Sequence, residues 1–329
     1  METGGIQVKQ FVKTFGIPLV MGMVVPYLFL SFGVTLLNRY RAQPQPEITL
    51  QTEIQPQEEK VSLPVLFREE DGSVQEMDMD TYLVGVVLAE MPASFEPEAL
   101  KAQSCVARTY ARKAWVTGGK HGDGSVCTEP SCCQGYRNEE TYLGAGGTAE
   151  AVEKVRAAVA ATSGSVLTYG GELIEATYFS CSGGRTEDAV AVWGTDFPYL
   201  QAVDSPGEED AAYYTDTKIM SLAELGDALD IRPDSITLGM ATYTEGGGIH
   251  TLDIGGKTFT GTQLRSLLGL RSTAFSMTLE DSQVRITTRG YGHRVGMSQY
   301  GADAMALSGS SWQQILSHYY PGTEVTWLS

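Results

Sequence analysis

The feature that most constrains this chain is a long uncharged segment near its N-terminus. Residues 14–38 run for 25 positions without a formal charge. As a helix they would span roughly 37 Å, more than the roughly 30 Å of a bilayer's hydrocarbon core. The segment is longer than the apolar core of a signal peptide and ends at the basic residues Arg39 and Arg41. We therefore predict a short tail over residues 1–13 and an uncleaved transmembrane helix over residues 14–38.

The rest of the chain changes character after this segment. Residues 39–60 are rich in Gln, Pro and Glu and lack apolar periodicity, which predicts a flexible stalk. Residues 61–329 alternate apolar periods typical of helices and strands with Gly-rich turns. We expect a single α+β domain there, in which helices are mixed with antiparallel strands and hairpins.

Helices are expected where apolar residues recur with a helical period beside a cap or a stop signal. Asp80 is the expected cap of the first helix and Pro92 its stop, while Pro97 is expected to open the second helix. The expected helices cover residues 80–89, 97–115, 148–162, 222–229, 264–268, 298–306 and 311–318. Hairpins are expected over residues 61–77 and 165–179, with further strands over residues 236–289 and a last strand after Gly322.

The charge balance bears on the class of partner. The chain carries 40 acidic and 23 basic residues, a net charge of −17. Nucleic-acid binding needs clustered Lys and Arg to neutralise phosphates, so we exclude it. An acidic surface by itself indicates little more than solubility.

Glu90 is the first candidate for chemistry. It follows an apolar run with one Gly and is the only acid between Asp80 and Glu96. At the C-terminus of a helix the dipole disfavours negative charge, and apolar neighbours disfavour it further, so both effects raise the pKa of the carboxyl group. A carboxyl group protonated near neutral pH can donate a proton to a leaving oxygen. The alternative is an ordinary surface Glu at a helix end.

His121, Cys127 and Cys133, with Cys132 beside the last, are the second candidate. Imidazole and thiolate suit Zn²⁺, although the spacing fits no common zinc finger. A Cys127–Cys133 disulfide is the alternative in an oxidising compartment. A zinc site with three protein ligands leaves its fourth position to water or to Cys132, so metal-dependent hydrolysis stays open.

Two Gly-rich motifs are further candidates for a ligand site. Residues 180–187 read Ser-Cys-Ser-Gly-Gly-Arg-Thr-Glu, and residues 290–301 read Gly-Tyr-Gly-His-Arg-Val-Gly-Met-Ser-Gln-Tyr-Gly. Gly residues suit close backbone approach to a ligand, and aromatic, Gln and His side chains suit sugars. A tight turn and a structural His are the alternatives. Cys181 could also serve as a thiol nucleophile with His293 as its base, although the sequence does not place them together.

Taken together, these motifs resemble the SpoIID family, the stage II sporulation protein D lytic transglycosylases of spore-forming bacteria. The matching runs are Ala-Glu-Met-Pro at residues 89–92, Ala-Leu-Lys-Ala-Gln with Ala-Arg-Thr-Tyr within residues 99–110, and the two Gly-rich motifs. The Trp-Gly and Phe-Pro-Tyr-Leu runs within residues 193–200 fit as well. The likeness covers about residues 60–329.

The resemblance implies a reaction for Glu90. It would protonate the oxygen between N-acetylmuramic acid and N-acetylglucosamine and then accept the proton of the sugar's own C6 hydroxyl, which gives a 1,6-anhydro end without consuming water. An ordinary glycosidase needs two opposed carboxylates, and the sequence offers no convincing second one. The resemblance also implies a structural zinc ion on His121, Cys127 and Cys133. Substrate contacts are expected from Lys101, Gln103, Arg108, Tyr110, Ser182, Arg185, Tyr291, His293 and Gln299.

The resemblance further implies where the enzyme would act and with which partners. The enzyme would act in forespore engulfment, on the outer face of the mother-cell membrane, on peptidoglycan glycan strands stripped of stem peptides by a partner amidase. A polytopic membrane protein would be its second partner.

The sequence also departs from the family pattern at several residues. Arg294 stands where the family usually has Gly, and Cys181 stands where Thr or Ser is common. Cys105 is expected in the core, and Cys132 is an unusual neighbour that can compete for the metal.

Two other functions stay open at this point. A zinc-dependent hydrolase of wall peptides would use the Cys cluster, but no His-Glu-x-x-His motif is present. A non-catalytic scaffold on a membrane stalk would bind glycan without cutting it.

Overall fold

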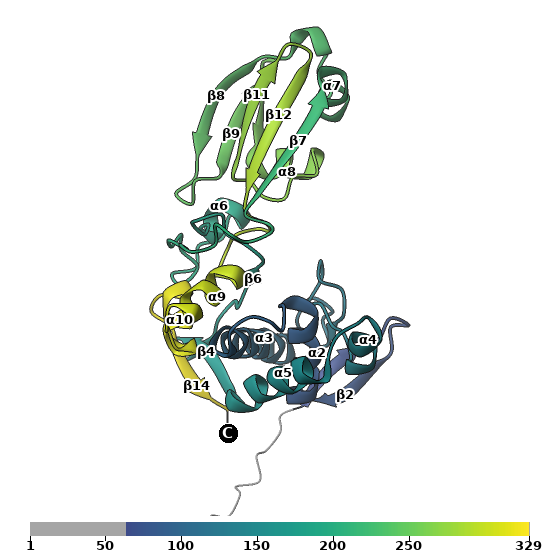
Figure 1. The fold of residues 1–329 in the computed structure, drawn as a ribbon, viewed down its shortest axis with the longest axis vertical. Coiled ribbons are helices and arrows are strands. Elements are labelled where there is room, and N and C mark those ends of the chain that lie inside the picture. The colour runs from purple at the N-terminus through teal and green to yellow at the C-terminus, as the bar shows by residue number, and fades with distance from the viewer. Residues whose placement is uncertain (1–63, 329) are drawn as a thin grey trace, which may run out of the picture. The chain divides into compact units, whose positions relative to one another are not determined.

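The computed structural model describes residues 64–328, so the predicted tail, transmembrane helix and stalk lie outside the described residues. Within residues 64–328, no helix is both long enough and apolar enough to cross a membrane. The described residues belong to one compact unit and pack around two hydrophobic cores. The predicted α+β class, with helices and antiparallel sheets, is confirmed (Figure 1).

The larger core is built on the helices α2 (Met79–Glu90), α3 (Pro97–Thr117) and α5 (Ala149–Ala161), which pack side by side (Figure 1). Every residue of α2 from Tyr82 to Leu88 is buried. A helix that is apolar on all sides is stable only inside a core, so α2 is the central element. Around it lie the shorter helices α4 (Glu139–Gly144), α9 (Gln299–Leu307) and α10 (Trp312–Tyr319).

The ends of α2 and α3 test the predicted caps. The side chain of Asp78 accepts a hydrogen bond from the Thr81 amide at 2.7 Å, so Asp78 caps α2 and the expected cap at Asp80 is wrong. Asp80 lies in the first turn instead and pairs with Arg108 at 3.0 Å. The helix ends before Pro92 as predicted, and Pro97 opens α3 as predicted.

Two small sheets border this core. The predicted first hairpin is β1 (Pro64–Arg68) with β2 (Val74–Asp78), and β3 (Val126–Cys127) joins β1 in parallel. In the second sheet, β4 (Ser165–Tyr169) lies between β5 (Glu172–Leu173) and β14 (Glu324–Trp327).

The second predicted hairpin is only partly right, because its return strand ends at Leu173. Residues Tyr178–Phe179 form β6, which pairs in parallel with β13 (Met297–Ser298) rather than with β4. Parallel pairing needs a partner far along the chain, and this pairing places the second Gly-rich motif beside the first. Isolated bridges from Cys181 to Tyr291 and from Glu187 to Val295 extend the contact.

The second core lies among six strands and two helices of residues 215–289. One sheet has the order β11 (Phe275–Glu280), β12 (Gln283–Arg289) and β7 (Thr215–Ser221). The other sheet has the order β10 (Lys257–Thr260), β9 (Ile249–Ile254) and β8 (Leu238–Tyr243). The helices α7 (Leu222–Leu229) and α8 (Gly261–Leu267) contribute Leu225 and Leu264 to the core.

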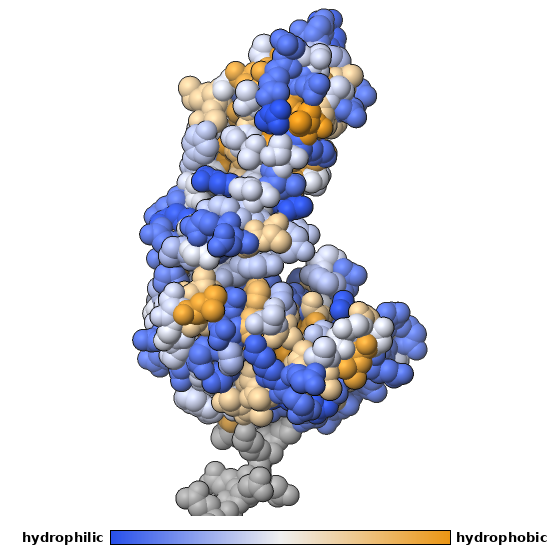
Figure 2. All heavy atoms as spheres, in the orientation of Figure 1, coloured by the Kyte–Doolittle hydropathy of each residue, from blue (hydrophilic) through white to orange (hydrophobic). Residues whose placement is uncertain are grey.

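Three short helical elements were not predicted, and neither was the strand β7. The helical elements are α4 and α6 (Ala189–Trp193), which both fall in segments expected to be loop, and the 3-10 turn η1 (Pro233–Ser235). β7 has no apolar–polar alternation in its sequence, and most of its residues are exposed or half-buried. The face seen in Figure 2 is largely hydrophilic, with apolar residues in small groups, as the acidic composition leads one to expect.

Candidate functional site

Glu90 is the last residue of α2, where the sequence predicted it, and its side chain is partly buried. Its Oε1 atom accepts a hydrogen bond from the backbone amide of Gly135. The hydroxyl group of Tyr178 contacts the same carboxyl group. One face of the carboxyl group is therefore fixed by a loop and by a strand that lie far from α2 in the sequence.

A buried hydrogen-bond network supports this arrangement from behind. The Tyr178 hydroxyl donates to Oε1 of Gln134 at 3.2 Å, and Nε2 of Gln134 donates to the Tyr82 hydroxyl at 3.1 Å and to the Ala107 carbonyl at 3.4 Å. All the polar atoms of the Gln134 side chain are thereby satisfied, as a buried amide requires. The network connects α2, α3, β6 and the loop before Gly135, so it holds the surroundings of Glu90 rigid.

Burial raises the pKa of Glu90, and the Gly135 amide limits that rise. The Tyr178 hydroxyl limits it as well when its single proton is directed to Glu90 rather than to Oε1 of Gln134. The direction is the one that the sequence predicted, with burial as its main cause. Within residues 64–328, no other carboxyl group acts on this pKa. The pKa of Tyr178 is raised well above its ordinary value by burial and then by Glu90, so its hydroxyl keeps its proton. The site thus presents one carboxyl group that can gain and lose a proton.

The second candidate is a compact cluster of His121, Cys127, Cys132 and Cys133. Their ligand atoms all lie within 4.8 Å of one another. The cysteines are free thiols, so the structure does not contain the alternative Cys127–Cys133 disulfide. Imidazole and thiolate are the ligand set that zinc prefers, and the residues fit that ion. Gln134 and Gly135 follow Cys133 directly, so the cluster lies at the start of the loop that contacts Glu90.

The thiol-nucleophile alternative finds no support in the geometry. The Cys181 thiol donates to Glu208 at 3.1 Å, and burial together with Glu208 raises its pKa. The thiol therefore stays protonated. His293 packs instead against Phe179 and Trp193, at centroid distances of 5.6 and 5.2 Å. Burial, followed by the charge of Arg265, lowers the pKa of His293 to about 4, so the ring is neutral.

The residues expected to contact substrate differ in their exposure. Only Tyr291 among them is exposed, at 43%. The partly buried ones are Lys101, Tyr110, Arg185 and His293. The buried ones are Gln103, Arg108, Ser182 and Gln299.

Two of the four buried members, Arg108 and Ser182, make internal contacts that account for their positions. Arg108 bonds Asp80 and the carbonyls of Thr162 and Val159, which ties α3 to α2 and α5. Ser182 donates to Glu208. Gln103 and Gln299 differ, since both amide atoms of Gln103 and the amide nitrogen of Gln299 have no hydrogen-bond partner among the described residues. Their expected roles in substrate binding stay predictions.

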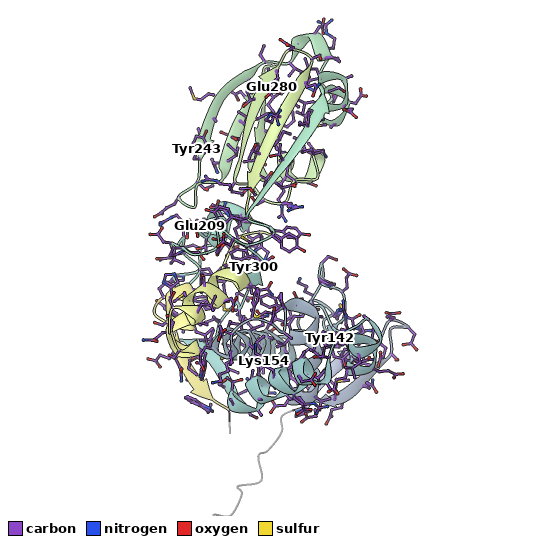
Figure 3. The ribbon with its side chains drawn as sticks, in the orientation of Figure 1. Tyr142, Lys154, Glu209, Tyr243, Glu280 and Tyr300 are labelled. Carbon is purple, nitrogen blue, oxygen red and sulfur yellow. The ribbon has the colours of Figure 1, made fainter. Side chains whose placement is uncertain are left out.

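Aromatic side chains form a row beside the Gly-rich motifs. Tyr213 packs against Tyr291 at 5.4 Å and against Tyr300 at 6.2 Å, and Tyr300 in turn packs against Phe95 at 4.9 Å (Tyr300 is labelled in Figure 3). Arg271 lies over the rings of both Tyr213 and Tyr291. Exposed aromatic faces are suited to stacking on sugar rings. Tyr213 lies outside every sequence motif and was missed.

Arg294 was singled out from the sequence as a departure, and the structure shows what its side chain contacts. The residue has a positive φ of 67°, which favours Gly. Its guanidinium group pairs with Glu187 at 3.1 Å and donates to the carbonyls of Ser182 and Gly246 at 2.7 and 2.8 Å. Both charged groups are almost fully buried. Arg294 therefore joins the two Gly-rich motifs to the turn before β9.

Fold and site define an α+β protein in which a partly buried carboxyl group with a raised pKa contacts the loop that follows a Cys and His cluster. A family model described as "Stage II sporulation protein" matches residues 68–169, which hold Glu90 and the cluster. The chain is 39% identical over 272 residues to stage II sporulation protein D of Bacillus subtilis (strain 168), covering 81% of this chain and 79% of that protein. The protein of the same name from Bacillus amyloliquefaciens is 38% identical over 275 residues, covering 82% and 80%. The chain belongs to the stage II sporulation protein D family.

A third relative has a different name. The chain is 32% identical over 300 residues to a protein of Bacillus subtilis (strain 168) named "Amidase enhancer", covering 74% of this chain and 40% of that protein. The likeness therefore reaches well beyond the segment that the family model matches.

Besides Tyr213, three residues around Glu90 were missed by reasoning from the sequence: Gln134, Gly135 and Tyr178. Gly135 and Gln134 had a weak signal, because they follow the Cys cluster directly. Tyr178 had none, because its contact with Glu90 depends on the parallel pairing of β6 with β13.

Proposed function

We propose that this protein is a lytic transglycosylase that cuts the glycan strands of peptidoglycan, with Glu90 as its single acid and base. The observation that carries the proposal is the Glu90 carboxyl group, which is partly buried and has a raised pKa, and on which no second carboxyl group of residues 64–328 acts. Family membership supports a role in the cell wall during sporulation.

The proposed reaction balances with one carboxyl group. Protonated Glu90 gives its proton to the glycosidic oxygen as the bond from that oxygen to C1 of N-acetylmuramic acid breaks. The C6 hydroxyl oxygen of the same sugar then bonds to C1, and the Glu90 carboxylate accepts the hydroxyl proton. The products are a 1,6-anhydro end and a free hydroxyl on the leaving sugar, and Glu90 is protonated again. Hydrolysis with inversion would need a second carboxylate, acting as the base that accepts a proton from the attacking water.

The setting is part of the proposal. Residues 14–38 would anchor the chain in the membrane, with the catalytic domain outside the cytoplasm. The name of the relative called "Amidase enhancer" supports work alongside a wall amidase, which would supply glycan strands stripped of stem peptides. The protein would also work with a polytopic membrane protein of the engulfment machinery. It would act at the mother-cell membrane that faces the forespore.

The test compares glycan products from three forms of the protein. The full chain in detergent, Glu90→Gln and the control Glu172→Gln, which changes an exposed acid on β5, are incubated with purified glycan strands without stem peptides. Mass analysis should find 1,6-anhydro ends with the first and third forms and a loss of at least about 100-fold with Glu90→Gln. Retained release of anhydro ends by Glu90→Gln would refute the proposal.

Other outcomes of this experiment identify the alternatives. Cleaved stem peptides in intact wall, stopped by a chelator and unaffected by Glu90→Gln, would identify a zinc-dependent peptide hydrolase. Glycan binding without any new chain end in every form would identify a scaffold.

A further inference from the structure

The Cys and His cluster contains one more potential ligand than the family resemblance implies. His121 comes from the turn after α3, Cys127 from β3, and Cys132 and Cys133 from a turn that begins at Glu129. The amides of Cys132 and Cys133 both donate to the Glu129 carbonyl, at 2.9 and 2.8 Å. This tight turn places two adjacent thiols on the same side of the loop.

The distances among the ligand atoms of His121, Cys132 and Cys133 match the edges of one tetrahedral metal site, and Cys127 Sγ lies within 4.8 Å of all three. With zinc about 2.3 Å from sulfur and about 2.0 Å from nitrogen, a tetrahedron has edges of roughly 3.8 Å between sulfurs and roughly 3.5 Å between sulfur and nitrogen. Cys133 Sγ lies 3.6 Å from His121 Nε2. Cys132 Sγ lies 3.8 Å from the same nitrogen and 3.9 Å from Cys133 Sγ. The two edges from Cys132 to His121 and Cys133 lie within about 0.3 Å of the ideal values, so Cys132 is placed to share the ion with both residues.

We propose that Cys132 is the fourth protein ligand, so that His121, Cys127, Cys132 and Cys133 form a closed tetrahedral zinc site. A closed site has no position for water or substrate, which makes the ion structural. The site then fixes the turn that leads directly into Gln134 and Gly135. The proposal concerns the metal alone, and its tests need no enzymatic activity, so it stands or fails independently of the reaction of Glu90.

The first test counts thiolate ligands with cobalt. The full chain in detergent is stripped of metal under reducing conditions and titrated with Co²⁺, whose charge-transfer absorbance grows with the number of thiolates bound. Cys132→Ala should lose about a third of that absorbance, because two thiolates remain of three. Its zinc affinity, measured by competition with a chromophoric chelator, should fall roughly tenfold or more. The control Cys105→Ala removes a buried thiol outside the cluster and should change neither value.

The second test uses the wild-type chain, so it does not depend on how a variant folds. The protein is treated with iodoacetamide with and without zinc, and the modified cysteines are identified by mass analysis. Zinc should protect Cys132 as strongly as Cys127 and Cys133. An equal rate of Cys132 modification with and without zinc, or an unchanged cobalt absorbance in Cys132→Ala, would overturn the proposal and assign the fourth position to water.

Discussion

The backbone amide of Gly135 donates a hydrogen bond to the carboxyl group of Glu90. This contact ties the loop after the Cys cluster to the C-terminus of α2. It also opposes the effect of burial on the pKa of Glu90, because an N–H donor stabilises the carboxylate. The same carboxyl group is thereby held in position, and its carboxylate form is stabilised once the proton has been donated.

Gly135→Ala should displace the carboxyl group of Glu90. An added Cβ would lie 2.9 Å from Oε1 and 3.3 Å from Cδ of Glu90, so the side chain or the loop must move. We expect the rate of anhydro-end formation to fall at least about tenfold, because small misplacements of a catalytic group are costly. Gly144→Ala is the matched control, since its Cβ would meet nothing within 4 Å. Equal activity of the two variants would show that the position of Glu90 is not critical.

Tyr178→Phe should shift the pH dependence of the reaction. The hydroxyl group lowers the pKa of Glu90, so its removal raises that pKa further. A general acid acts only when protonated, and the limb of kcat/KM that falls with rising pH should therefore move to higher pH. The variant also leaves Oε1 of Gln134 without this donor, which should cost about 1–3 kcal/mol of stability.

The control for this variant is Tyr142→Phe, which removes a hydroxyl group from α4 (Tyr142 is labelled in Figure 3). It should leave the pH profile in place. A profile that is the same in Tyr178→Phe and in the wild type would exclude the Tyr178 hydroxyl from control of Glu90.

Glu90→Gln should stabilise the fold at high pH while abolishing activity. The pKa of Glu90 in the folded protein lies above its ordinary value of 4.5. The folded state therefore holds this proton more tightly, and its stability falls as the pH rises through the folded-state pKa. Gln cannot ionise, so the variant does not lose stability in this way as the pH rises. Its side-chain oxygen can still accept the hydrogen bond from the Gly135 amide. The unfolding temperature of the variant should exceed that of the wild type by on the order of 2 °C at about pH 8.

The difference in unfolding temperature between Glu90→Gln and the wild type should itself depend on pH, and measurements at low pH provide the control. Below the ordinary value of 4.5 both states are protonated, so the advantage of Glu90→Gln should disappear there. An advantage of the same size at low and high pH would assign it to packing rather than to the carboxyl charge.

Local sequence patterns predicted the helices better than the long-range pairings. α7 was predicted at Leu222–Leu229, where it lies, because its cap and apolar period are contained in the segment itself. The cap of α2 was missed by two residues, because Asp78 and Asp80 are both good caps and only the Arg108 pair shows why Asp80 lies inside the helix. The pairing of β6 with β13 depends on residues more than one hundred positions away, which no local pattern encodes.

The residues of the candidate site also fall into two groups, those that a local sequence pattern predicted and those whose role depends on contacts between distant segments. Glu90 was identified because its position at the end of an apolar helix is visible in the sequence, and its raised pKa follows from that position. Gln134 and Tyr178 were not identified, because the hydrogen bonds that give them a role join segments distant in the chain. Arg294 was noticed only as a departure, and its pairing with Glu187 emerges only from the folded structure.

Arg294→Ala should destabilise the fold strongly. Its guanidinium group is the partner of the buried Glu187 carboxyl group and also holds the Ser182 and Gly246 carbonyls. Removing it leaves a buried charge without its partner, which costs about 3–5 kcal/mol. Urea unfolding should show this loss. The matched control is Arg285→Ala, which breaks the exposed pair with Glu280 (labelled in Figure 3) and should cost less than about 1 kcal/mol.

A second substitution distinguishes lost charge pairing from lost packing. Glu187→Gln added to Arg294→Ala replaces the unpaired carboxylate by a neutral amide that can still accept from Thr244 and Gly248. If the buried charge dominates the loss, the double variant should be more stable than Arg294→Ala alone. A double variant that is less stable would instead assign the role of Arg294 to the carbonyls it holds, and the ion pair would not be what joins the two Gly-rich motifs.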